Sequence, residues 1–98
     1  MATLRKQDLG MFGQARWKYL QESKPALWMS MQSSGKLEAH LLEADARGER
    51  MYEAMVEQLS AQEIPTGLQS SDPVSYMIAL ESVLDRAREA VLTEVSYA

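Results

Sequence analysis

The longest amphipathic pattern in the chain covers residues 36–64. At 100° per residue its apolar positions fall on one face, which predicts a long helix docked on a core. These positions are Leu37, Leu41, Ala44, Gly48, Tyr52, Met55 and Leu59. On the opposite side, Glu49, Glu53 and Glu57 follow one another at i, i+4 and form an acidic row, with Glu38 beside it. The pattern therefore predicts a helix with one apolar and one acidic face.

Two short helices are predicted before this long one. Phe12, Ala15, Tyr19 and Leu20 recur at helical spacing and indicate a helix over residues 11–23. Pro25 suits the first turn of a second helix, over residues 25–33, because its φ is already helical. We expect residues 1–9 to be a flexible lead-in and residues 10–98 to form a single domain.

A last helix is predicted from Asp72 almost to the end of the chain. Asp72 can cap the first amides, and Pro73 fits the first turn. Its wide apolar face consists of Val74, Met77, Leu80, Val83, Leu84, Ala87, Val91, Leu92 and Val95. Residues 65–71, rich in Gly, Ser and Thr, are predicted as a loop. No alternating strand pattern occurs, so we predict an all-α, four-helix domain with two short N-terminal helices packed on a long antiparallel helical hairpin.

One polar residue, Asp45, interrupts the apolar stripe of the long helix. Arg88 lies at the edge of the apolar stripe on the last helix, and Arg16 lies on the first helix. In an antiparallel hairpin, Asp45 and Arg88 can approach one another. The hypothesis is a partly buried ion pair of Asp45 with Arg88 or with Arg16, which makes Asp45 and Arg88 structural residues.

Composition narrows the class of protein. The chain has 98 residues, 46% of them hydrophobic, which is enough for one core, and it contains no cysteine. Disulfides and thiolate metal sites are therefore excluded. No apolar run has the length of a membrane span and no signal peptide is recognisable, so we expect a cytoplasmic protein. The net charge of −4 divides into +4 over residues 1–36 and −8 over residues 37–98.

Catalytic and metal-binding patterns are weak. His40 and Glu43 form an i, i+3 pair, but a metal needs further ligands and no second histidine is present. Nucleophilic catalysis needs a base beside a Ser or Thr, and a single His without a nucleophile turn motif does not provide this arrangement. Gly10 and Gly13 do not indicate a phosphate-binding loop, because no strand precedes them and no Lys-Ser/Thr pair follows. We expect no enzyme, no cofactor and no metal.

Two charged surfaces remain as candidate binding sites. The first consists of basic residues near the N-terminus: Arg5, Lys6, Arg16 and Lys18. Arg16 and Lys18 alternate with Trp17 and Tyr19, a pattern that suits contact with a phosphate backbone or a stacked base. The second consists of the acidic residues Glu38, Glu49, Glu53 and Glu57. These residues suit a partner protein with a basic channel that normally binds nucleic acid. A solvated helix face is the common alternative for such a row.

Several segments spread along the chain match a known family. They are Gly10-Met-Phe-Gly13, Tyr19-Leu20, Lys24-Pro25-Ala26-Leu27, Ser34-Gly35-Lys36-Leu37, His40-Leu41-Leu42-Glu43, Asp45, Glu49-Arg50-Met51, and the run from Arg86 to Val95 followed by Tyr97. In these segments the chain resembles the TnpV proteins of bacterial transposons. Between Pro65 and Ser82 it departs from the family pattern. The resemblance implies a place on a mobile element and carries over no catalytic residue.

Together these features predict a non-enzymatic accessory protein of a mobile element. The first hypothesis is that it binds and modulates a larger nucleic-acid-handling protein, for example a CRISPR-type defence nuclease, through the acidic face. The alternative is a recombination or excision factor that binds DNA through its basic N-terminal helices. The sequence predicts no membrane partner and is compatible with a homodimer.

Overall fold

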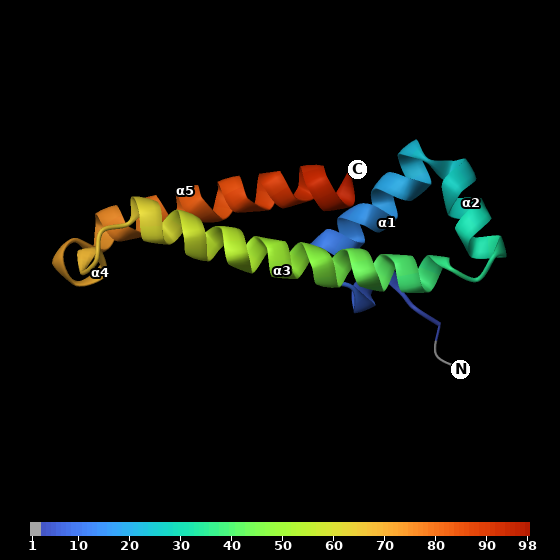
Figure 1. The fold of residues 1–98 in the computed structure, drawn as a ribbon, viewed down its shortest axis with the longest axis horizontal. Coiled ribbons are helices and arrows are strands. Elements are labelled where there is room, and N and C mark those ends of the chain that lie inside the picture. Colours follow the sequence, from blue (N-terminus) through green and yellow to red (C-terminus); the bar gives the residue numbers. More distant parts are fainter. Residues whose placement is uncertain (1–2) are drawn as a thin grey trace.

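The computed structural model describes residues 3–98, which form helices and turns and contain no strand (Figure 1). The elements in chain order are η1 (Lys6–Asp8), α1 (Met11–Ser23), α2 (Pro25–Ser33), α3 (Leu37–Glu63), α4 (Leu68–Ser71), α5 (Pro73–Val91) and the π-helical turn η2 (Leu92–Ser96). The predicted all-α fold is confirmed. α1 and α2 have the predicted bounds, and α3 begins and ends one residue inside the predicted range.

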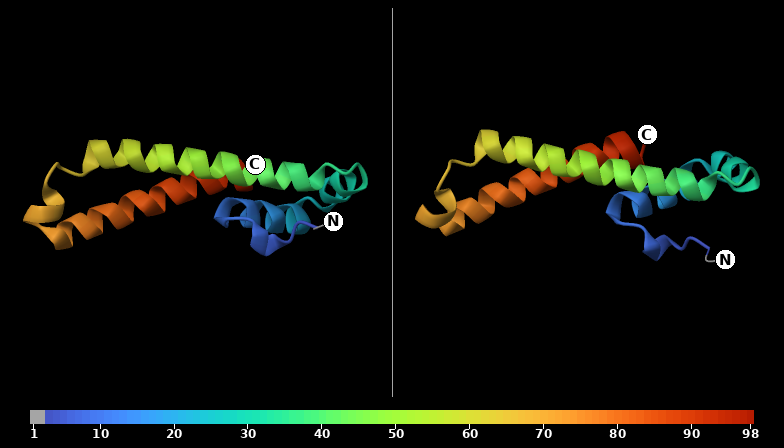
Figure 2. Two further views of the ribbon diagram at one scale, coloured as in Figure 1. Left: turned by 90° about the horizontal axis from the view of Figure 1, so that it is seen from below. Right: turned by 60° about the horizontal axis from the view of Figure 1, so that its bottom comes forward.

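α3 is the spine of the molecule. Its 27 residues form a helix about 40 Å long, in a molecule that measures 56 × 27 × 17 Å. α5 runs antiparallel to it and packs on its C-terminal half, while α1 and α2 pack at its N-terminal half (Figures 1 and 2). η2 lies between these two regions and contacts α1, α3 and α5. The predicted arrangement of short helices on a long hairpin is therefore present.

Two buried clusters hold α1 on the hairpin. Phe12 from α1, Ala44 from α3, Val91 from α5 and Val95 from η2 form the first. The second joins Leu9, Leu20 and Leu41, with Trp17, Trp28 and Met31 packed against it. The apolar stripe predicted on α3 is buried or half-buried along its whole length, because α1 covers its first half and α5 its second.

The close approach of α1 to α3 depends on a glycine. A Cβ at Gly48 would lie 2.6 Å from Cβ of Phe12, well inside van der Waals contact. A glycine in the middle of a helix costs about 1 kcal/mol relative to alanine. Here it allows the Phe12 side chain to pack directly against the α3 backbone in the first cluster.

The structure differs from the prediction at three places. The predicted loop contains one helical turn, α4, which packs on α5. Leu9, predicted within the lead-in, is 4% exposed and belongs to the core. Val74 and Met77, predicted on the buried face of the last helix, are 70% and 62% exposed. Both lie in the first turns of α5, which project past the end of α3 (Figure 1).

Candidate functional site

The acidic row lies on the outer surface of α3. Glu49, Glu53 and Glu57 are all exposed, and within residues 3–98 none of them makes an ion pair. Glu38 is also exposed, but it lies eleven residues before Glu49, about 16 Å along the helix. The structure therefore brings together three of the four predicted acidic residues and leaves the fourth at the other end of α3.

Negative charge extends from this row to the far end of the hairpin. Residues 49–81 contain six acidic residues and a single base, Arg50, and carry a net charge of −5. Arg50 points back along α3 to Glu43, with 3.6 Å between Nη2 and Oε1. The ion pair that joins the two hairpin helices, Glu63 with Arg86, lies at the end of α3, with 2.8 Å between Oε2 and Nη1. The acidic row itself is thus not neutralised by these cations.

The four basic residues predicted to contact nucleic acid do not form one surface. Lys6 and Lys18 are exposed, and Arg5 pairs with Asp8 at 3.3 Å. Arg16 is only 8% exposed, so its prediction as a surface contact is wrong. Helical geometry turns Arg16 inward from Lys18, because residues two apart lie on different faces of a helix.

Arg16 is instead the centre of a buried polar network. Its Nε donates to Nε2 of His40 at 3.2 Å, and its Nη1 donates to the carbonyl oxygens of Ser96, at 3.2 Å, and of Ala98. The buried Ser96 hydroxyl in turn donates to the Phe12 carbonyl at 2.9 Å. Burial, and then the Arg16 charge, lower the pKa of His40, so the imidazole is held neutral as a hydrogen-bond acceptor. This network ties α1 and α3 to the end of η2.

Asp45 caps α1, and the predicted ion pair with Arg88 or Arg16 is wrong. Its Oδ2 accepts from the amide of Gly10 at 3.0 Å, and its Oδ1 accepts from the amide of Gly13 at 2.9 Å. These are the N-cap and N3 positions of α1. Arg88 pairs with Asp85, one turn away on α5. The carboxylate thus finds hydrogen-bond donors in the free amides of a helix N-terminus, which also attracts negative charge.

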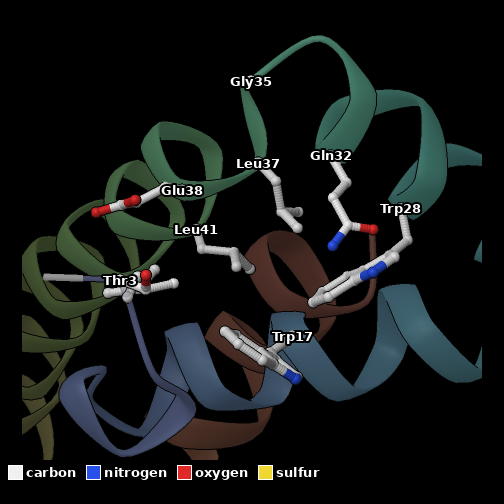
Figure 3. A pocket seen from close by; sticks show the side chains of 9 residues that line it. Thr3, Trp17, Trp28, Gln32, Gly35, Leu37, Glu38 and Leu41 are labelled. Atoms are coloured by element: carbon white, nitrogen blue, oxygen red, sulfur yellow. The ribbon is translucent and has the colours of Figure 1, made fainter. Parts of the chain in front are cut away.

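An apolar cavity of about 340 Å³ lies between α1, α2 and the start of α3 (Figure 3). Trp17 and Trp28 meet edge to face in its wall, with 5.1 Å between ring centroids. The Gln32 amide points into the cavity, whereas the Glu38 carboxylate points away from it (Figure 3). Within residues 3–98 there is no cluster of three metal-ligating side chains, and His40 uses Nε2 to accept from Arg16.

Comparison with known proteins decides the family. The model of the family described as transposon-encoded protein TnpV matches residues 1–96. The chain belongs to the TnpV family. No curated protein and no solved structure matches it. The resemblance found in the sequence is thus confirmed, and TnpV membership associates the chain with transposons. None of the helices in residues 3–98 has both the length and the apolar character required to cross a bilayer.

Sequence reasoning missed two structural sites in this TnpV protein. A helix start with glycine at both the N-cap and N3 positions has no side chain with which to cap itself. Together with the carboxylate of Asp45 in an apolar stripe, this was a signal for a cap supplied by another helix. The buried role of Ser96 left no comparable signal, because nothing near it in the sequence indicates that Arg16 and Phe12 meet it.

Proposed function

We propose that this TnpV protein is a non-enzymatic, cytoplasmic accessory protein that binds and modulates a nucleic-acid-handling protein, such as a CRISPR-type defence nuclease. The observation that carries the proposal is the exposed acidic row of α3, which lies in a region with a net charge of −5. Consecutive carboxylates along the row rise by about 6 Å. A basic channel that holds a nucleic acid backbone offers the complementary charge.

The alternative, a recombination factor that binds DNA, is weakened by the burial of Arg16. Of the four predicted contacts, only Lys6 and Lys18 are exposed and outside the ion pairs of residues 3–98. Non-specific DNA affinity rises with the number of phosphates that cations neutralise, so two lysines supply little of it. The acidic remainder of the protein repels DNA.

Charge reversal tests the proposal in cells. A CRISPR nuclease is directed against a plasmid, and plasmid retention is measured with and without the TnpV protein. We expect the wild type to protect the plasmid and the Glu53→Lys, Glu57→Lys double variant to lose this protection, since two repulsive charges then face the basic channel. The matched control is Glu22→Lys with Glu89→Lys, which changes the net charge equally at exposed positions outside the row.

Two results would contradict the proposal. If the plasmid is lost equally with the wild type and with the Glu53→Lys, Glu57→Lys variant, the CRISPR nuclease is not the partner. If the purified wild type binds DNA with a steep salt dependence, and the Glu53→Lys, Glu57→Lys variant binds it more tightly, the DNA-binding alternative replaces the proposal.

A further inference from the structure

Three apolar side chains are exposed together at the far end of the hairpin. Val74, Met77 and Ile78 are 70%, 62% and 65% exposed. They lie at i, i+3 and i+4 on α5 and therefore form one stripe along the helix. Glu81 and Asp85, both exposed, continue this stripe at i+7 and i+11.

The stripe is exposed because it lies on the outer side of α5, in turns that begin beyond the end of α3. The Arg86 side chain folds back onto Ser82 and also binds Glu63, the last residue of α3. The end of α3 therefore lies beside residues 82–86 of α5. The first turns of α5 continue past the end of α3 and pack on α4 (Figure 1). One side of these turns is half-buried, through Tyr76, Ala79 and Leu80, and the opposite side carries the exposed stripe.

The charge around the stripe limits what can cover it. Asp72 precedes it and Glu81 follows it, whereas Asp85 is already paired with Arg88. Residues 49–81 carry a net charge of −5. A second copy of the protein packed tip to tip would bring two such regions together, which like-charge repulsion disfavours. An anionic membrane surface is disfavoured for the same reason.

We propose that the stripe of Val74, Met77, Ile78, Glu81 and Asp85 is a docking surface for a basic amphipathic helix of a partner protein. Apolar residues of that helix cover Met77 and Ile78, and its Lys or Arg residues face Glu81, which makes no ion pair within residues 3–98. This is the helix-on-helix mode of recognition, in which side chains at i, i+3 and i+4 are the anchors. Methionine suits such a surface, because its flexible thioether adapts to different partners. The inference rests on the proposed function and specifies the kind of segment that the partner presents.

A synthetic helix tests the surface without knowledge of the partner. The probe is a fluorescein-labelled amphipathic peptide of leucine and lysine, about 18 residues long, titrated with the full-length protein and followed by anisotropy. We expect binding that weakens with salt, and a rise in Kd of at least about tenfold for Met77→Ser with Ile78→Ser, since each buried apolar side chain contributes on that scale. Glu81→Lys should raise Kd by about threefold and reduce its salt dependence.

The chain offers matched controls for both changes. Met29 in α2 is 65% exposed, close to the 62% of Met77, but lies at the other end of the molecule. Met29→Ser and Glu22→Lys should leave the Kd of the peptide unchanged. A peptide with glutamate in place of lysine should not bind.

Three results would overturn the proposal. The peptide fails to bind, or Met29→Ser weakens binding as much as the α5 variants do, or light scattering shows a wild-type dimer that the α5 variants convert to monomer. The last result assigns the stripe to a second copy. Because the assay contains no nuclease, its failure is distinct from a failure of the plasmid-protection test.

Discussion

The carboxylate of Asp45 in α3 accepts a 2.9 Å hydrogen bond from the amide of Gly13 in α1. The same side chain binds the amide of Gly10 with its other oxygen. In a capping box, the N-cap and N3 side chains satisfy these two amides reciprocally. Here both positions are glycine, and one carboxylate from another helix replaces both side chains. The start of α1 is therefore completed only when α1 docks on α3.

Gly13→Ala should destabilise the protein. Its Cβ would lie 2.7 Å from Cβ of Asp45, so the helices must separate or the cap must shift. Overpacking of this kind costs about 1 to 3 kcal/mol, although helix propensity alone favours alanine by about 1 kcal/mol. Urea denaturation measures the change, with Gln21→Ala on the exposed side of α1 as the control. A Gly13→Ala protein as stable as the wild type would show that α1 and α3 are not in this contact.

Asp45→Asn should also destabilise the protein, by about 1 to 3 kcal/mol. The amide side chain keeps one acceptor oxygen and places a donor against the second backbone amide. The measurement is the free energy of unfolding in urea, compared with that of Asp85→Asn, which changes an exposed carboxylate of α5. An equal effect of the two substitutions would contradict a special role for Asp45.

Arg16→Lys separates a structural role from a DNA-binding role. Lysine keeps the positive charge but loses the planar fork that binds His40, Ser96 and Ala98 together. We expect a loss of about 1 to 3 kcal/mol of stability and no change in DNA binding. Lys18→Arg, at an exposed position, is the control. Normal stability combined with altered DNA affinity would return Arg16 to the nucleic-acid surface.

His40 should make stability depend on pH. Burial and the Arg16 charge lower its pKa in the folded protein below the ordinary 6.5. The unfolded chain therefore takes up a proton at higher pH than the folded protein does, and stability falls as pH drops from 6.5 towards the folded pKa. Arg16, Glu43, Arg47 and Glu94 line the pocket around the ring.

Urea midpoints are measured at about pH 7.5 and about pH 5.5, on either side of the ordinary pKa of histidine. His40→Gln keeps an acceptor for Arg16 but does not titrate, so its midpoint should change less between the two pH values. Identical pH dependence of the two proteins would exclude His40 as the source.

The sequence by itself determined the four longer helices and the family. The start of α5 follows from local chemistry, since Asp72 caps the helix through the Ser75 amide at 3.2 Å and Pro73 occupies its first turn. The stripe of α3 follows from its 3.6-residue period. These are properties of neighbouring residues, and the chain alone contains them.

Tertiary structure decided which polar groups meet and which apolar groups remain in solvent. Arg16 and Ser96 are separated by 80 residues, and no local pattern indicates their hydrogen bond. Asp45 binds backbone amides, which every residue except proline possesses and which a search for complementary side chains therefore overlooks. Periodicity placed Val74 and Met77 on an apolar face, but only the packing of α5, which turns Tyr76 and Leu80 inward, determines that nothing in residues 3–98 covers them.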